Sequence, residues 1–169
     1  MPKGPRGCGT LLSGSHVGLS MACNLRSISL LPFAMVTISA TYSGNKKCSL
    51  VHPAGATLKT DAPKDIGGDA SAFSPTDLMA AGLASCILTT IAMYCERNGI
   101  VIGNPTAVVE KHMSVPPAPR RISRLPAYVE LPASIPPELR ERIEKVGYAC
   151  PVHASLPSDI EKPITYKYI

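Results

Sequence analysis

The chain has 169 residues, a length that indicates one globular domain with a sizeable core. Hydrophobic residues make up 45% of it and charged residues only 17%, below the usual share of about a quarter, so we expect an oligomer that hides apolar surface. The net charge is +5 and no acid precedes Asp61, but the early cations are scattered and not interleaved with aromatics, which argues against a nucleic-acid partner.

The cysteines indicate a reducing compartment. Their spacing is irregular and no Cys-x-x-Cys pair occurs, so the sequence contains neither a zinc ribbon nor a thioredoxin motif. A chain of this length needs no disulfide framework, and no convincing secretion signal is present. We therefore expect free thiols and a cytoplasmic protein. The cysteines are Cys8, Cys23, Cys48, Cys86, Cys95 and Cys150.

Residues 1–34 differ from the rest in being rich in glycine, serine and other small residues without a steady period. Three interpretations fit: a disordered tail, a targeting peptide, or an extension upstream of the true start, since Met35 directly precedes a clean strand pattern. We favour a flexible N-terminal extension, followed by a folded domain over residues 35–169.

The folded part begins with an antiparallel meander. Apolar and polar residues alternate over 36–42, which predicts a half-buried strand, and Ser43–Asn45 predicts a turn. Two more short strands follow over 47–52 and 56–60, separated by Pro53–Gly55.

A loop over 61–73 leads to a long helix. Ser74, Pro75 and Asp77 predict its start through a capping box and a proline at the first helical position, and Gly99 predicts its end. The 18 residues from Leu78 to Cys95 carry no charge, which meets the lower limit for a membrane span. Serine, threonine and cysteine within the segment, together with soluble flanking strands, favour a helix between a sheet and a partner subunit, so we expect no membrane.

The second half of the chain predicts two strands, a surface helix, a short helical turn and a last strand. Pro126 within the second of these strands implies an edge or a bulge, and Gly147 is the predicted end of the surface helix. The predicted segments are a strand over 105–115, a proline break over 116–119, a strand over 121–131, a helix from 136–137 to 147, a helical turn from 151 and a strand over 164–169. This order defines an α+β domain.

Two cysteines carry the chemistry. A thiol with a pKa near 8.5 is only about 3% ionised at pH 7, so a nucleophilic cysteine needs help. Cys150 precedes Pro151 and should face the free N–H groups of a helix start, with His153 on the same face, so local reasoning predicts that Cys150 is the more acidic thiol. Cys86 lies in the middle of the apolar helix, where a cysteine is more often inert. Its activation would need a cation or donor from another segment or subunit.

Two other interpretations of Cys150 and His153 were considered. They would form half of a metal site, but no second pair completes it, so we predict no metal. They would also form a hydrolytic pair, but both lie on one short turn rather than across a cleft.

Four segments together resemble the OsmC/Ohr family of osmotically inducible and organic hydroperoxide resistance proteins. The resemblance covers residues 36–169 and implies an OsmC-like fold, with antiparallel sheets around a long buried central helix in the order βββ-α-ββ-α-(short α)-β. It also implies an intertwined homodimer. The segments are Gly67-Gly68, Phe73–Leu78, Ala80–Cys86 and Cys150–His153.

The resemblance further implies a peroxidase that reduces organic hydroperoxides. Cys86 would attack the peroxide and become a sulfenic acid, Cys150 would resolve it as an intramolecular disulfide, and a dithiol reductant would reopen that bond. No cofactor or metal would be needed.

This sequence departs from the peroxidase-type members at two places. Lys46 and Lys47 stand near where those members carry an arginine, and Thr76 stands where they carry a glutamate. Another arginine would have to take the place of the missing one, and the candidates are Arg120, Arg121 and Arg124. The alternative hypothesis is a non-catalytic dimeric OsmC-like module that binds a small lipophilic ligand.

Overall fold

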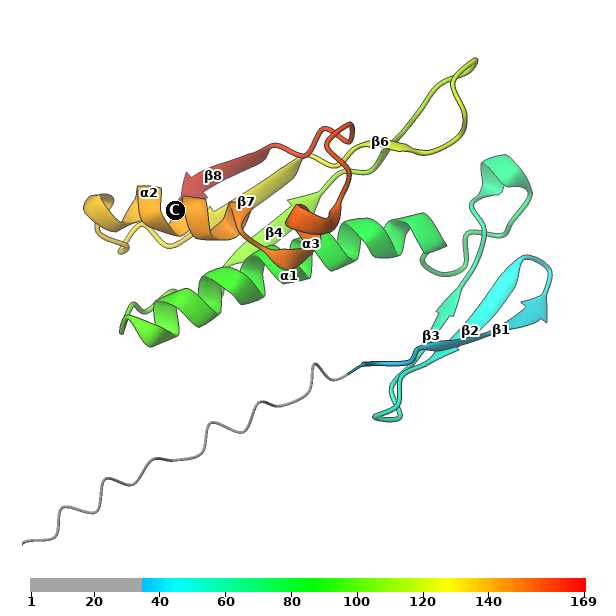
Figure 1. Cartoon of the computed structure of the whole chain (residues 1–169), viewed down its shortest axis with the longest axis horizontal. Helices are drawn as coiled ribbons and strands as arrows, with labels where there is room; N and C mark the ends of the chain where they lie inside the picture. Colours follow the sequence, from blue (N-terminus) through cyan, green and yellow to red (C-terminus); the bar gives the residue numbers. More distant parts are fainter. Residues whose placement is uncertain (1–34) are drawn as a thin grey trace, which may run out of the picture. The chain divides into compact units, whose positions relative to one another are not determined.

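The computed structural model describes residues 35–169, and the extension predicted for residues 1–34 lies outside them. The described elements follow the predicted order, and Figure 1 shows them along the chain. Each of the segments 105–115 and 121–131 is divided into two short strands rather than one. The elements are β1 (Ser39–Gly44), β2 (Lys47–Val51), β3 (Thr57–Thr60), a 3₁₀ turn η1 (Lys64–Ile66), α1 (Pro75–Arg97), β4 (Thr106–Val109), β5 (His112–Met113), β6 (Ile122–Arg124), β7 (Ala127–Leu131), α2 (Pro137–Tyr148), α3 (Pro151–Ser155) and β8 (Ile164–Tyr168).

The strands β1, β2 and β3 form the predicted antiparallel meander. Asn45 and Lys46 make the turn between β1 and β2, both at positive φ, as a tight two-residue hairpin requires. The prediction that the first strand is half-buried was wrong for the single chain. Ile38 is 52% exposed and Tyr42 67% exposed, because the described chain places no layer on the face that these residues occupy.

The helix α1 has the predicted boundaries. Ser74 caps its start, Asn98 is the C-cap, and Gly99 follows with a φ of 67°. Its fully or nearly buried residues recur every three or four positions and form one stripe, which packs against β4, α2 and α3. These residues are Ala80, Leu83, Ile87, Ile91 and Cys95.

Among residues 35–169, α1 is also the one helix that is long and apolar enough to cross a membrane by length and composition. A core helix in a soluble fold passes the same test. The buried stripe gives α1 a packing role against the sheet, as the sequence predicted. The other flank stays exposed in the single chain, with Met79 and Met93 each nearly half accessible.

The sheet formed by β4, β7 and β8 differs in one respect from the expected antiparallel arrangement. The central strand β7 is antiparallel to β4 but parallel to β8. The physical reason is the connection between β7 and β8, which contains α2 and α3 and therefore returns the chain in the same direction. The helices α1, α2 and α3 and this sheet enclose the core (Figure 1).

Pro126 lies at the junction between β6 and β7, where the ladder is interrupted, in agreement with its predicted effect. The strand β6 pairs with β5 in a two-stranded ribbon with a bulge at His112 and Met113, and its Arg124 forms an isolated parallel bridge with Glu161. Beyond the junction, the side chains of Ala127, Val129 and Leu131 alternate into the core.

Gly147 does not end the surface helix, contrary to the prediction. The helix α2 continues to Tyr148 and Ala149 is its C-cap. Gly147 is buried, and a Cβ at this position would lie 2.0 Å from the hydroxyl oxygen of Tyr166 on β8. The glycine therefore permits the close approach of α2 to β8.

Gly147→Ala should destabilise the protein by about 1–3 kcal/mol, the usual cost of overpacking a core, as measured by urea unfolding. Tyr166→Phe removes the hydroxyl that the new methyl group would meet, at the cost of its hydrogen bond to the Glu144 carbonyl. The double variant should therefore lose less stability than the sum of the two single variants. Strict additivity would contradict this explanation of Gly147.

Candidate active site

Cys86 lies in the middle of α1, and its position follows from how that helix begins. Ser74 Oγ accepts a hydrogen bond from the Asp77 N–H at 3.2 Å, and the Asp77 carboxylate accepts one from the Ser74 N–H at 2.7 Å. This reciprocal cap fixes the helix start and thus the face on which Cys86 falls. Cys86 is half-buried and packs against the hydrophobic core, so it is more accessible than the buried thiol that the sequence suggested.

Cys150 is the N-cap of α3 and is fully buried. Its Sγ accepts a hydrogen bond from the His153 N–H at 3.3 Å, while Pro151 occupies the first helical position. The predicted short helix with a cysteine at its start is therefore present. The structure places that start inside the core rather than at an exposed helix end.

The packing of α3 against α1 brings the two predicted site residues together. The Cys86 side chain lies close enough to Cys150 to interact with its thiol. Burial raises the pKa of Cys150 above its ordinary value, the His153 N–H opposes that shift, and the neighbouring Cys86 raises the pKa further. The local argument for an acidic Cys150 counted the helix start but neglected desolvation, which acts in the opposite direction and prevails.

The His153 imidazole ring interacts with groups other than the Cys150 sulfur. Its Nε2 lies 3.1 Å from the Lys162 carbonyl oxygen, as a donor to that oxygen, and its ring meets the Tyr148 ring edge-to-face with centroids 5.4 Å apart. Of the His153 groups, the backbone N–H rather than the ring bonds the Cys150 sulfur. Within residues 35–169, no group of three His, Cys, Asp or Glu side chains is suitably placed to hold a metal ion.

The other thiols lie away from this pair. Cys95 follows Cys86 by nine residues, which places it on roughly the opposite side of α1, and it is fully buried in the core stripe. Burial raises its pKa. Cys48 is half-buried on β2, whereas Cys8 and Cys23 lie outside the described residues.

Lys46 and Lys47, the candidates for an activating cation, bind carbonyl and carboxylate groups of their own chain. Lys46 Nζ donates to the Gly67 carbonyl at 2.9 Å. Lys47 Nζ contacts carboxylate oxygens of Asp61 at 2.8 Å and Asp69 at 2.6 Å, which ties β2 to the loop before α1. Hydrogen bonding from Lys47, and from Ser71, holds the pKa of Asp61 well below its usual range.

The three candidate arginines also form ion pairs with loop carboxylates of the same chain. These pairs are Arg120 with Asp65 at 2.9 Å, Arg121 with Asp159 at 2.5 Å and Arg124 with Glu161 at 2.7 Å. Lys46, Arg120 and Thr76 line one hollow of about 220 Å³ at the start of α1. Thr76 precedes Cys86 by ten residues, or about 15 Å along a helix, so this hollow is remote from Cys86 of the same chain.

Sequence reasoning missed Lys111. Its Nζ forms an ion pair with Asp77 and donates to Thr76 Oγ1 at 3.0 Å, so it joins the segment after β4 to the cap of α1. Burial favours a higher pKa for Asp77, but Lys111 and the Ser74 N–H hold it below the ordinary value. The one available signal was that Lys111 lies two positions from Val109 and from Met113 in a strand pattern, on the same face as these apolar residues. Asp77 and Cys86, nine residues apart, face opposite sides of α1.

An apolar hollow of about 340 Å³ lies between α1 and α3. Gly82 on its wall precedes Cys86 by one helical turn, and Pro151 on its wall directly follows Cys150, so the hollow lies beside the helix segments that carry the two thiols, although neither cysteine lines it. We call it the α1–α3 hollow. Its lining is Leu78, Met79, Gly82, Pro151, Val152, Ser155 and Leu156.

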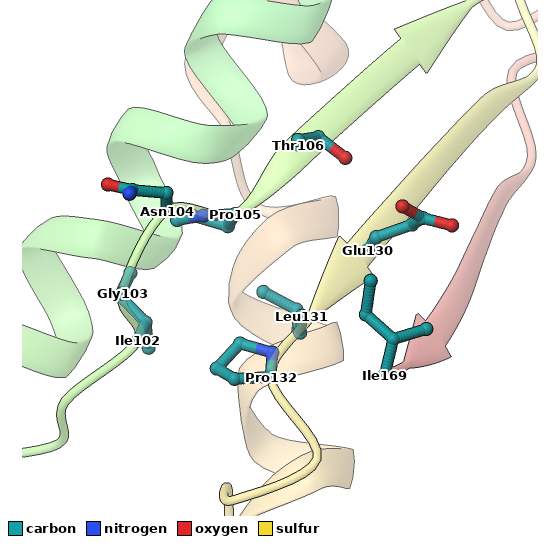
Figure 2. Close-up of a pocket in the computed structure, with 9 residues that line it drawn as sticks. All are labelled: Ile102, Gly103, Asn104, Pro105, Thr106, Glu130, Leu131, Pro132 and Ile169. Atoms are coloured by element: carbon teal, nitrogen blue, oxygen red, sulfur yellow. The ribbon is translucent and has the colours of Figure 1, made fainter.

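A different hollow, of about 170 Å³, lies where β7 ends and β4 begins. Figure 2 shows its lining, which includes Asn104, Glu130 and the terminal residue Ile169, and none of its lining residues lies on α1 or α3, the helices that carry Cys86 and Cys150. The side chains around it offer no nucleophile beside an apolar surface. The thiol pair and the α1–α3 hollow are therefore the better candidate for the functional site.

The fold is that of an α+β protein whose packing brings two thiols together. Comparison with known proteins identifies its family. A sequence profile described as OsmC-like protein matches residues 68–164, more than half of the chain. The chain therefore belongs to the OsmC-like protein family, and the predicted OsmC-like fold is confirmed. No curated protein sequence matches the chain.

Solved structures agree with this assignment. An osmotic stress induced and detoxification response protein of Psychrobacter arcticus 273-4 is 33% identical to this chain, with a TM-score of 0.73. The match covers 79% of this chain and 97% of that protein's chain. The OsmC-like protein of Mycoplasma pneumoniae is 20% identical with a TM-score of 0.70, over 81% and 99%. An organic hydroperoxide resistance protein OsmC of Legionella pneumophila is 17% identical with a TM-score of 0.66, over 80% and 98%. The last two support the fold alone.

Iodoacetamide should label Cys86 in the native protein at pH 7 well before it labels Cys150 or Cys95, because only Cys86 of the three is accessible. The raised pKa of Cys150 means that its thiolate forms only as the pH rises beyond the ordinary value of 9.0, so its labelling should stay slow until then. Peptide mass spectrometry measures both rates. Equal labelling of Cys86 and Cys150 at pH 7 would contradict the burial described.

The ion pair of Asp61 should make stability fall in acid. The folded-state pKa of Asp61 lies below its ordinary value of 3.8, so its stabilising contribution is present above that pH and is lost as the pH falls below it. The thermal midpoint of the wild type should therefore drop between about pH 5 and pH 2, and that of Asp61→Asn should drop less. Asp69→Asn, which changes the exposed partner of the same lysine, serves as the control and should keep the wild-type acid dependence.

Proposed function

We propose that the protein is a thiol-dependent peroxidase that reduces organic hydroperoxides. One observation carries the proposal: two thiols of unequal accessibility, Cys86 and Cys150, are brought together beside an apolar hollow. A peroxidase of this type needs an exposed attacking sulfur, a second sulfur close by and space for an alkyl group. Membership of a family that includes organic hydroperoxide resistance proteins supports the same function.

In the first step, the Cys86 thiolate attacks one oxygen of the hydroperoxide. The O–O bond breaks, the sulfur becomes a sulfenic acid, and the other oxygen leaves as an alcohol after it takes a proton. Two electrons pass from sulfur to the peroxide. Cys86 fits this role better than Cys150, because a substrate reaches a half-buried sulfur more easily than a fully buried one.

In the second step, Cys150 attacks the Cys86 sulfenic acid. An S–S bond forms and water leaves with the proton of the Cys150 thiol. The raised pKa of Cys150 keeps it as a neutral thiol until Cys86 has been oxidised, which separates the two roles. A dithiol reductant then reduces the disulfide and becomes oxidised itself.

An activating cation for Cys86 is proposed to come from the partner in a homodimer. The candidate lysines and arginines of the described chain are engaged by their own carboxylates and carbonyls, and Lys46 and Arg120 lie near the start of α1. Apolar side chains on β1–β3, such as Tyr42 and Leu58, and on the open flank of α1, such as Met93, are suited to burial against a second copy. Free thiols agree with a cytoplasmic location.

A second candidate function is non-catalytic binding of a small lipophilic ligand by a dimeric module. The observation in its favour is the apolar α1–α3 hollow, which would accept such a ligand whether or not Cys86 reacts. In that case Cys86→Ser would leave ligand affinity and cellular phenotype intact. In the peroxidase, the same change abolishes turnover.

Near-stoichiometric cumene hydroperoxide should consume two thiols per reduced chain and give a Cys86–Cys150 disulfide in the peptide map. In Cys150→Ser, dimedone should trap a sulfenic acid on Cys86. Cys86→Ser should lower peroxide consumption by about 10³-fold or more, the scale of losing a nucleophile. Cys48→Ser, a half-buried thiol on β2, is the matched control and should behave as wild type. An unchanged thiol count in the wild type would exclude the peroxidase.

A further inference from the structure

We propose that Gly82 determines the size of the substrate, because its missing side chain keeps open the α1–α3 hollow for the apolar group of a bulky organic hydroperoxide. This inference rests on the proposed peroxidase function and deepens it. It assigns a specificity-determining residue, Gly82 of α1, to the proposed reaction.

Glycine at position 82 has no explanation in the packing of the described chain. Within a helix, glycine is less stable than alanine, because it loses more backbone freedom on folding. A Cβ at position 82 would meet nothing within 4 Å, and Gly82 is not among the glycines with a positive φ. Gly147, by contrast, is required by the Tyr166 hydroxyl. Alanine would therefore suit position 82 if helix stability and packing were the only constraints.

The location of Gly82 supplies the missing constraint. Gly82 lines the α1–α3 hollow and lies one turn before Cys86 on a neighbouring face of the same helix. A side chain on Gly82 would project into the space that adjoins the reacting sulfur. Val152 and Leu156 of α3 form the wall opposite, so any added carbon narrows the hollow between the two helices.

The dimensions and lining of the hollow indicate its occupant. Its volume is about 340 Å³, and an apolar cavity of about 150 Å³ already holds benzene. Six of its seven lining residues are apolar or glycine, with Ser155 as the exception. The hollow therefore suits a cumyl-sized group, with the hydroperoxide directed towards Cys86. Hydrogen peroxide has no apolar group and gains nothing from this space.

The test compares hydrogen peroxide, tert-butyl hydroperoxide and cumene hydroperoxide as substrates of Gly82→Ala and Gly82→Leu. Gly82→Leu should lower kcat/KM for cumene hydroperoxide by about 10-fold or more and leave kcat/KM for hydrogen peroxide within about twofold of the wild-type value. With cumene hydroperoxide, kcat/KM of Gly82→Ala should lie between the values of the wild type and Gly82→Leu. Gly82→Ala should also raise Tm by about 2–4 °C. The control is Ala154→Leu, which places the same leucine side chain at an exposed position of α3 outside the hollow.

A second readout needs no turnover. Cumyl alcohol, the product of cumene hydroperoxide, should bind the Cys86→Ser protein, and Gly82→Leu in that background should weaken binding by about 10-fold, whereas Ala154→Leu should not. Calorimetry or chemical-shift titration measures the affinity. If the wild type reduces no hydroperoxide but Gly82 still controls alcohol binding, the peroxidase proposal fails and the size-determining role stands.

Three outcomes would overturn the inference. The first is an equal loss of kcat/KM for all three peroxides in Gly82→Leu, which would mark a general disturbance of Cys86. The second is unchanged selectivity and unchanged alcohol binding. The third is a shift towards monomer in sedimentation velocity without altered selectivity, which would mean that a second copy of the chain fills the hollow.

Discussion

The site depends on one packing contact, that of the short helix α3 against the long helix α1. This contact buries the sulfur of Cys150, brings it to Cys86 and forms both walls of the α1–α3 hollow. The five residues of α3 are too few to be stable alone, so their conformation is maintained by the surrounding core and by the Cys150 cap. The thiol pair is consequently a product of tertiary structure rather than of either local motif.

Burial and helix capping act in opposite directions on Cys150, and their magnitudes decide which prevails. A charge at a helix N-terminus is stabilised by about 0.3–1 kcal/mol, less than one pKa unit of about 1.4 kcal/mol. Desolvation of a fully buried group shifts a pKa by up to about 3–5 units. Cys150 is fully buried and its pKa is raised, so desolvation wins. The raised pKa and the burial of Cys150 suit it to the second, resolving step of the proposed reaction.

Local signals predicted the local features well. The boundaries of α1 followed from Ser74, Pro75 and Gly99, because capping and helix termination depend on neighbouring residues. The parallel pairing of β8 with β7 and the true role of Gly147 did not follow, because each depends on a contact between segments distant in sequence. The same reason applies to Lys111, whose partners lie more than thirty residues earlier in the chain. The hollow beside the thiols was equally hidden, since no sequence pattern records empty space between two helices.

The parallel pairing of β7 with β8 has a consequence for the order of folding. The strand β8 is the last of the described elements, and the connection that carries Cys150 spans the residues between the two strands. Pairings between distant segments form late, because closing a long loop costs chain entropy before the contacts are gained. During synthesis the central sheet therefore stays incomplete until residues 164–168 leave the ribosome. The nascent chain thus holds Cys86 on a helix that can form early, while the connection that carries Cys150 is fixed at both ends only after β8 has paired with β7.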